Sequence, residues 1–208
     1  MQYLQERITI PQGPTLTFRR IANVEELIDR AEEVDDLPFW AELWPSALAL
    51  SAYLWQEEKL HLSQQPLLEL GCGLGLAGIV AALKGAKVVQ SDFVSAALSV
   101  AAENSRFNGV ETQQVQADWR NFPAELGTFS YIIGSDILYE PDVHEALEKV
   151  LHHHLAPQGQ VILTDPGRKG AQQFLQRLPQ GYHIEKSTQR IHLDGKDYRI
   201  DLYHLRRD

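Results

Sequence analysis

The chain has a single cysteine and few basic residues, and both shortages narrow its possible functions. Because Cys72 has no second cysteine to pair with, an intramolecular disulfide and an all-cysteine zinc site are excluded, and a reducing compartment is favoured. The 19 Lys and Arg residues against 28 Asp and Glu residues give a net charge of −9, which disfavours binding to nucleic acid phosphates. We therefore expect a cytoplasmic protein without a nucleic acid partner.

Long apolar runs are also missing. None approaches the roughly 18 residues that a membrane-spanning helix needs, so we expect no membrane partner. The first residues, MQYLQERITIPQG, have neither the apolar core of a signal peptide nor the Arg-rich character of a transit peptide. No internal repeat, linker or shift in composition divides the chain, and we expect a monomer with a single domain over residues 1–208.

Short apolar runs alternate with helix-like segments from residue 66 to 165. This alternation is typical of βαβ units on a parallel sheet, and it predicts the core of an α/β fold. The expected strands cover 67–70, 87–92, 112–117, 129–136 and 160–165, the expected helices cover 75–84, 95–109 and 144–155, and a turn is expected over 156–159.

The segments on either side complete that fold. Residues 181–188 and 197–205 alternate apolar and polar side chains around Asp194-Gly195, which indicates an antiparallel strand pair. Together with the five core strands, they predict a doubly wound, mostly parallel, seven-stranded Rossmann-like sheet. Residues 166–208 would complete the sheet and residues 1–60 would form an N-terminal extension. The further expected elements are a hairpin of strands 8–10 and 15–18, and helices over 23–33, 45–56 and 168–178.

The string LLELGCGLGLAG (67–78) places glycines where a strand turns into a helix. The pattern Gly73-x-Gly75-x-x-Gly78 matches a dinucleotide fingerprint, and Asp92 follows Gly75 by 17 residues, at the end of the next strand. A carboxylate there can accept both hydroxyls of a ribose. Glu69 would oppose the pyrophosphate of a dinucleotide but would suit a cationic methionyl group, so S-adenosylmethionine is favoured as the cofactor.

Four motifs carry a family resemblance: ELGCGLG (69–75), SDF (91–93), ADW (117–119) and GSDILYE (134–140). They resemble the successive motifs of the class I, seven-strand, S-adenosylmethionine-dependent methyltransferases. More narrowly, the chain is similar to methyltransferase family 16, whose members methylate protein lysines and carry an acidic-x-x-Tyr motif after the fourth strand. PFWAELWPSALALSAYL (38–54) is similar to the segment in which that family places a tryptophan beside the cofactor.

The resemblance implies roles for individual residues. Trp44 would border the methionyl side, Asp92 would hold the ribose, and Trp119 would lie against the adenine, whose amino group Asp118 would reach. Ser135 and Asp136 would close the pocket. The full set of implied cofactor contacts is Trp44, Glu69, Gly71, Gly73, Gly75, Asp92, Phe93, Asp118, Trp119 and Ser135.

Asp136 and Tyr139 are the expected catalytic residues, because open α/β sheets bind ligands at the carboxyl ends of their strands. Asp136 would bind and orient an incoming amine, with Tyr139 as an aromatic wall and hydrogen-bond acceptor. Asp136 could instead cap the turn at Pro141. No metal is expected, since His152, His153 and His154 would point in different directions from one helix.

The expected activity is N-methylation of a lysine in a protein substrate. A small-molecule amine or a protein histidine remains open as the acceptor, because Pro45-Ser46 stands where some lysine-specific relatives have an acidic residue. Other readings are an NAD(P)-dependent oxidoreductase, with Tyr182 and Lys186 as its weak candidate pair, and an inert nucleoside-binding module. An acidic rim for a basic partner is expected at Asp35, Asp36, Glu42, Asp136, Glu140 and Asp142.

Overall fold

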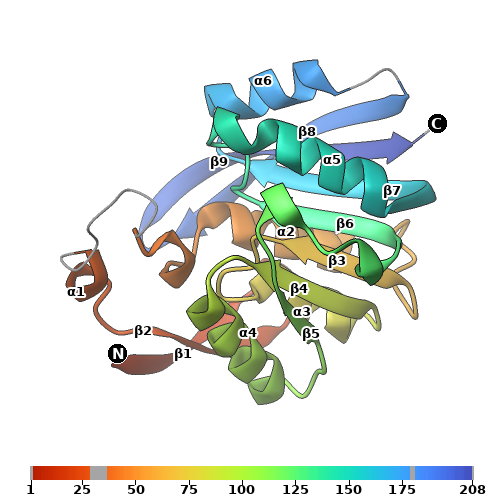
Figure 1. The fold of residues 1–208 in the computed structure, drawn as a ribbon. Helices are drawn as coiled ribbons and strands as arrows, with labels where there is room; N and C mark the ends of the chain where they lie inside the picture. The colour runs from red at the N-terminus through yellow and green to blue at the C-terminus, as the bar shows by residue number, and fades with distance from the viewer. Residues whose placement is uncertain (1, 29–36, 179–180, 208) are drawn as a thin grey trace.

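Seven strands form the central sheet of the computed structural model, which describes residues 2–28, 37–178 and 181–207 (Figure 1). Their order is β5-β4-β3-β6-β7-β9-β8. The first five are parallel, β9 runs antiparallel to β7, and β8 runs antiparallel to β9. This arrangement confirms the predicted fold class. The bounds are β3 (Pro66–Leu70), β4 (Lys87–Asp92), β5 (Gln113–Gln116), β6 (Phe129–Ser135), β7 (Leu155–Asp165), β8 (Tyr182–Leu193) and β9 (Lys196–Arg207).

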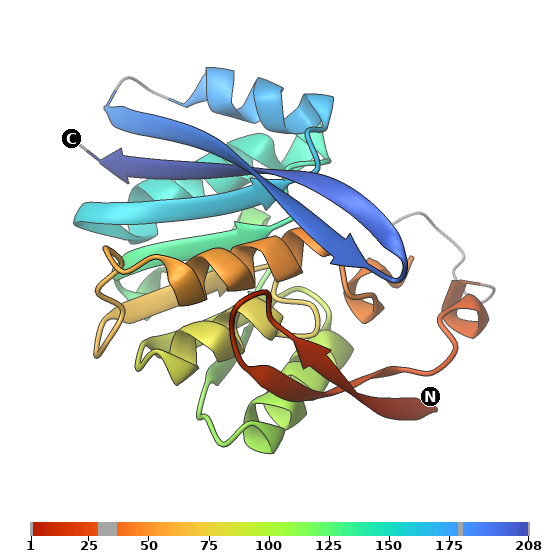
Figure 2. The ribbon, with the colours of Figure 1, turned by 180° about the vertical axis from the view of Figure 1, so that it is seen from behind.

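Helices cover both faces of this sheet, as Figures 1 and 2 show from opposite sides. On one face α2 packs against α3, and α4 lies beside α3. On the other face, α5 and α6 pack on the sheet. The bounds are α2 (Pro45–Gln56), α3 (Leu76–Leu83), α4 (Ser95–Phe107), α5 (His144–His154) and α6 (Lys169–Arg177).

Alternation along the central strands builds two separate hydrophobic cores. Leu67 and Ile133 point into the core beneath α2 and α3, whereas Leu68 and Ile132 point into the core beneath α5. Successive side chains of a strand face opposite sides of the sheet, so a run of apolar residues such as LLEL fills both cores. All four of these side chains are fully buried.

The N-terminal hairpin of β1 (Tyr3–Thr9) and β2 (Thr15–Ile21) packs against α4. Asn104 of α4 and Asn108, the residue that follows the helix, bind the edge of β2 as a neighbouring strand would. The Asn104 side chain accepts the Arg19 N–H at 2.7 Å and donates to the Arg19 carbonyl at 3.1 Å, and Asn108 makes the same two contacts with Thr17. The predicted hairpin is therefore present and its outer edge is satisfied.

Several predicted elements differ in extent. The first hairpin strand, expected over 8–10, is β1 (Tyr3–Thr9), so its prediction began too late. The turn expected over 156–159 lies inside β7, where Phe129 pairs with Leu155 but Tyr131 pairs with Gln160, so β7 carries extra residues as a bulge. Gln158 has a φ of 61°, which fits this irregularity. The expected 23–33 helix is seen as α1 (Glu25–Ile28), and its remainder reaches residues outside the described ranges.

Short 3₁₀ helices connect the main elements at η2 (Phe39–Ala41), η3 (Trp119–Asn121), η4 (Ala124–Leu126) and η5 (Pro141–Val143). Within the described ranges, no helix has the length and apolar character needed to cross a membrane.

Candidate functional site

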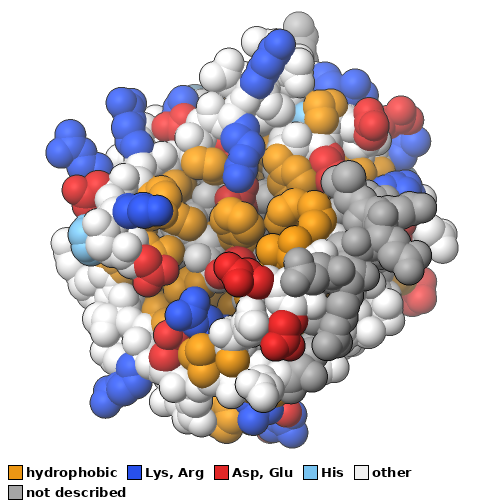
Figure 3. All heavy atoms as spheres, turned by 90° about the vertical axis from the view of Figure 1, so that its left-hand side faces the viewer, with side chains coloured by type: hydrophobic (Ala, Val, Ile, Leu, Met, Phe, Trp, Pro, Cys, Tyr) orange, Lys and Arg blue, Asp and Glu red, His pale blue; other side chains and the backbone are white. Residues whose placement is uncertain are grey.

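The parallel strands end on the side of the molecule that Figure 3 faces. Loops at this edge carry most of the predicted site: the glycine loop after β3, Asp92 at the end of β4 and Asp136 after β6. The η2 segment crosses the same edge, since a Cβ on Gly73 would lie 3.2 Å from the Trp40 carbonyl oxygen. Hydrophobic side chains surround acidic ones near the centre of this face (Figure 3).

The glycine loop has a backbone that only glycine adopts easily. Gly71, Gly73 and Gly75 have φ values of 59°, 50° and 86°. A Cβ on Gly71 would lie 2.9 Å from Ile137 Cγ2, and one on Gly75 would lie 2.9 Å from Ala101 Cβ. The loop therefore presents bare backbone between the end of β3 and the N-terminus of α3, where a ligand can approach closely.

Asp92 holds this loop to the end of β4. Its Oδ2 accepts the Gly73 N–H at 2.9 Å and its Oδ1 accepts the Val94 N–H at 3.0 Å. The side chain is buried, and burial raises the pKa of Asp92 while the two N–H donors oppose that rise. Each carboxylate oxygen keeps a second lone pair, so Asp92 can accept a ligand hydroxyl and still hold the loop.

Glu69 lies beneath the glycine loop. Its side chain is 3% exposed and accepts a hydrogen bond from Gln90 Nε2 at 2.7 Å, and the same nitrogen donates to the Gly75 carbonyl at 3.0 Å. Burial raises the pKa of Glu69 to about 7, against the hydrogen bonds from Gln90 and the Gly78 backbone. These contacts make Glu69 and Gln90 supports of the loop. A direct contact of Glu69 with a methionyl group stays a prediction.

Aromatic side chains from two distant segments meet at this edge of the sheet, which we call the acceptor end because it holds the predicted catalytic residues Asp136 and Tyr139. The rings of Phe39 and Tyr139 lie 6.2 Å apart edge to face, and Phe39 and Trp44 lie 6.4 Å apart. The Trp44 indole N–H donates to the Phe39 carbonyl at 2.8 Å, which ties η2 to the start of α2. Phe39 and Tyr139 are partly exposed, at 43% and 42%, so part of each side chain is open to solvent.

Asp136 stands at the end of β6 in a left-handed conformation, with a φ of 59°. Its backbone N–H donates to the Thr164 carbonyl at 2.8 Å. The carboxylate lies 3.5 Å from the Ser46 hydroxyl and forms an ion pair with Arg168, which is the residue before α6. Asp136 therefore contacts β7, α2 and the residue before α6. Its side chain is almost buried.

Four other predicted cofactor contacts lie near the same edge. The Trp119 ring comes within 3.6 Å of the position of a Cβ on Gly71. Asp118 caps η3 by accepting the backbone N–H two residues later at 2.9 Å. Phe93 is 60% exposed and Ser135 is half-buried. The contacts of these four residues with a cofactor stay predictions.

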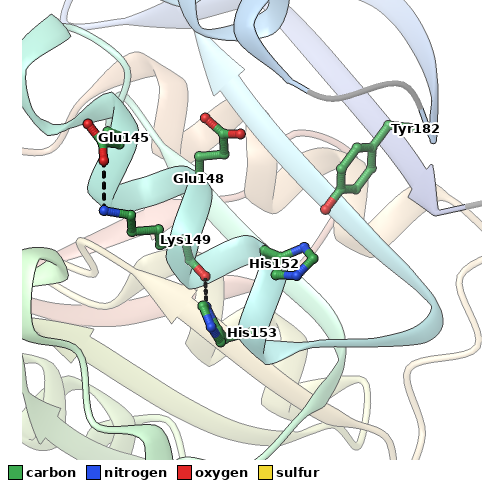
Figure 4. Close-up of a pocket in the computed structure, with 6 residues that line it drawn as sticks. All are labelled: Glu145, Glu148, Lys149, His152, His153 and Tyr182. Atoms are coloured by element: carbon green, nitrogen blue, oxygen red, sulfur yellow. Dashed lines mark hydrogen bonds and ion pairs between the residues drawn. The ribbon is translucent and has the colours of Figure 1, made fainter.

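A separate pocket of about 290 Å³ lies along α5, on the opposite face of the sheet from α3 (Figure 4). The three consecutive histidines turn in different directions there. His152 faces Arg207 at 3.1 Å, whereas His153 and His154 donate to the Lys149 and Gly127 carbonyls. The pocket is lined by Glu145, Glu148, Lys149, His152, His153 and Tyr182, none of which is a predicted cofactor contact.

Sequence reasoning missed three residues that shape the site: Gln90, Arg168 and Phe39. Arg168 had a usable signal, because the string DPGR (165–168) follows a strand whose carboxyl end meets the others at this edge. Gln90 had a weaker signal, as a polar residue directly after two valines in the expected strand over 87–92. For Phe39, only its place beside the tryptophans pointed to the site.

Comparison with known proteins finds mostly lysine methyltransferases, together with histone-arginine methyltransferases. A family model described as lysine methyltransferase matches residues 25–180. The chain is 29% identical over 176 residues to the EEF1A lysine methyltransferase 3 of Mus musculus, covering 80% of this chain and 72% of the relative. It is 36% identical over 146 residues to the protein N-lysine methyltransferase METTL21A of Xenopus tropicalis, covering 67% of this chain and 66% of the relative.

A solved structure shares the fold at low sequence identity. The N-methyltransferase NodS from Bradyrhizobium japonicum, in complex with S-adenosyl-L-homocysteine, superimposes with a TM-score of 0.64 at 16% identity. The match covers 88% of this chain and 97% of that one.

Proposed function

The chain belongs to the lysine methyltransferase family, and we propose that it transfers a methyl group from S-adenosylmethionine to a lysine amine of a protein substrate. The observation that carries the proposal is the pairing of two features at one sheet edge. The bare glycine loop held by Asp92 lies beside the partly exposed aromatic end at Phe39 and Tyr139. The first suits a nucleoside and the second suits an alkylamine.

The residues present fit the cofactor. Side chains at Gly71 and Gly75 would collide with Ile137 and Ala101, so the absence of a Cβ keeps the loop close to neighbouring segments and open to a ligand. Asp92 would accept the ribose hydroxyls and Trp119 would lie against the base. When bound, S-adenosylmethionine supplies an electrophilic methyl group on a sulfonium sulfur.

The side chains at the acceptor end have two tasks. They must place the amine nitrogen within about 3–3.5 Å of the methyl carbon, in line with the breaking bond. They must also favour the neutral amine, whose formation from a lysine with a pKa of about 10.4 costs roughly 4.6 kcal/mol at pH 7. The apolar rings of Phe39 and Tyr139 lower this cost by desolvating the ammonium form.

The proposed partner is a protein with an exposed, basic lysine segment. Glu42 and Asp142 are exposed and Glu140 is half-buried near the acceptor end, and with the net charge of −9 they favour a basic partner over nucleic acid. Of the other expected members of this rim, Asp35 and Asp36 lie outside the described residues, and Asp136 is almost buried and paired with Arg168. We propose further that the chain works as a monomer in the cytoplasm, with one domain.

The test is transfer of label from methyl-radiolabelled S-adenosylmethionine to an extract, followed by acid hydrolysis and amino-acid analysis of the labelled protein. The proposal predicts methyl-lysine in a protein band, with a rate that falls between low and physiological salt as exposed charges are screened over about 8 Å. Label in methyl-histidine, methyl-arginine, RNA or the small-molecule fraction would contradict it. Tyr139→Phe should reduce the labelling.

A further inference from the structure

The ion pair between Asp136 and Arg168 has no part in the function proposed so far. It joins the end of β6 to the residue before α6, and Arg168 Nη1 also lies 3.6 Å from Asp165 Oδ2. These contacting atoms, Arg168 Nη1, Asp136 Oδ1 and Asp165 Oδ2, are inaccessible to solvent. Screening by water is therefore weak at the contact, even though the Arg168 side chain as a whole is 38% exposed.

The local fold fixes Arg168 in this place. Asp165 Oδ1 accepts the backbone N–H of Gly167 at 2.7 Å and of Arg168 at 2.6 Å, so the turn after β7 aims the Arg168 side chain back over the strand ends. Two residues later, a Cβ on Gly170 would strike the Leu138 carbonyl oxygen, which shows how closely α6 approaches the β6 loop. Burial raises the pKa of Asp165 and lowers that of Arg168.

Among the described residues, Arg168 is the cation that contacts Asp136 directly, and the nearby Lys186 is paired with another carboxylate. Lys186 is 2.7 Å from Asp201 Oδ2 and forms its own ion pair with that carboxylate. Among the described residues, the groups that contact the pair or act on Asp165 are Ser46 of α2, Lys186 of β8, and Asp201 and Tyr203 of β9. His144 of α5 contacts the Leu138 carbonyl on the loop that follows Asp136.

We propose that Arg168 is a positioning residue for methyl transfer: by pairing with Asp136, it offsets the carboxylate charge where the amine binds, so that the acceptor reacts in its neutral form. This role rests on the proposed function. An uncompensated carboxylate within about 4–6 Å of an amine stabilises the ammonium form, which cannot attack the methyl group. Arg168 holds Asp136 as a hydrogen-bond acceptor for the amine without that opposing effect.

Two variants give shifts of opposite sign in the pH dependence of kcat, which reports groups in the enzyme–substrate complex. Arg168→Gln leaves the Asp136 charge uncompensated, so the pH at which kcat reaches half its plateau should rise by about one unit. Asp136→Asn removes the negative charge and leaves Arg168 with Asp165, so the same midpoint should fall. A merely structural role would lower the plateau and leave both midpoints in place.

The experiment measures kcat as a function of pH, with saturating concentrations of the cofactor and of a lysine-containing peptide that the wild-type chain methylates. Arg168→Lys keeps the charge and should keep the wild-type midpoint, as should Lys169→Gln, which removes an exposed charge from the next residue. If Arg168→Gln does not fold, Arg168→Met, which also removes the charge but keeps most of the aliphatic side chain, is measured in its place. Unmoved midpoints, or shifts in the same direction, would overturn the role of Arg168. Absence of lysine methylation by the wild-type chain at every pH would overturn the proposed function and this role together.

Discussion

The two ends of the site are built in different ways. The cofactor end is centred on Leu67–Asp92, a short continuous stretch held by hydrogen bonds to backbone groups and by buried side chains such as Gln90, and predicted contacts such as Trp44 and Trp119 join it from other segments. The acceptor end brings together Ser46, Asp136 and Arg168, which are far apart in sequence and meet through side chains. A site formed by contiguous backbone tolerates few substitutions. At the assembled end, by contrast, substitutions at several positions can alter how the methyl acceptor binds.

The largest effect is expected at Gly71, where the cofactor end is least tolerant. Gly71→Ala places a Cβ 2.9 Å from Ile137 Cγ2 at a φ of 59°, so the loop must shift. Strain and overpacking together cost about 3 kcal/mol or more, and cofactor Kd should rise by over about a hundredfold in calorimetry. Gly127→Ala has a similar φ of 73° but open space around it, so it should lose some stability and no cofactor affinity. Equal affinities for the two variants would contradict this picture.

The next effect concerns stability and the buried carboxylate under the loop. The pKa of Glu69 is raised from 4.5 to about 7 in the folded chain, so folding disfavours its ionised form and the free energy of unfolding falls as the pH rises through that interval. Glu69→Gln removes this loss. Denaturant unfolding without cofactor should show a gain of roughly 3 kcal/mol at pH 8 and almost none at pH 4.5.

The exposed Glu111→Gln serves as the control and should give no pH-dependent gain. A loss of stability from Glu69→Gln at both pH values would mean that its charge supports the fold. The same variant also separates support from direct contact. A large loss of cofactor affinity would favour a contact between Glu69 and the methionyl group.

Asp92→Ala should weaken cofactor binding by roughly ten- to a hundredfold, because two hydrogen bonds to the ribose are each worth about 0.5–1.5 kcal/mol and charge assistance adds to them. The loss of its contact with the Gly73 N–H also loosens the loop. Titration calorimetry measures the change. Asp118→Ala, which removes a more exposed acid near the same edge, should have a smaller effect. If Asp92→Ala binds the cofactor with unchanged affinity, Asp92 does not contact the cofactor.

The smallest effect is expected at the assembled end. Tyr139→Phe removes one hydroxyl and should lower kcat about tenfold, the value of one hydrogen bond of about 1.4 kcal/mol, with cofactor Kd unchanged. Steady-state kinetics on the methylated peptide measure it. Tyr3→Phe changes an equally exposed tyrosine, at 42%, on the N-terminal hairpin and should leave kcat unchanged. Full activity in Tyr139→Phe would make Tyr139 a structural residue.

The contrast between the two ends also explains what could be predicted from the sequence. The strands, helices and glycine loop follow from local patterns: the expected strand over 87–92 and helix over 45–56 match β4 and α2 residue for residue. The antiparallel pair followed from alternation together with the turn at Asp194-Gly195. The bulge over 156–159 was missed because a Pro and a Gly indicate a turn equally well when the partner strand is unknown.

Side-chain partners at the acceptor end could not be predicted. The ion pair of Asp136 depends on the distance between β6 and α6, which no local pattern encodes. Glu69 was expected to face a ligand because of its place before the glycines, but its orientation follows from the strand pleat and from Gln90 on the neighbouring strand. Contacts that depend on local backbone geometry can therefore be predicted from a sequence. Contacts between side chains of distant segments can be identified only once the fold is known.

A double-mutant cycle on Asp92→Ala and Tyr139→Phe tests most directly whether the two ends work separately. Transition-state stabilisation is taken from kcat/KM for the acceptor peptide at subsaturating cofactor, for wild type, both single variants and the double variant. Separate ends predict additive losses, with a coupling energy below about 0.5 kcal/mol. A coupling energy well above about 1 kcal/mol would contradict the division into a contiguous cofactor end and an assembled acceptor end.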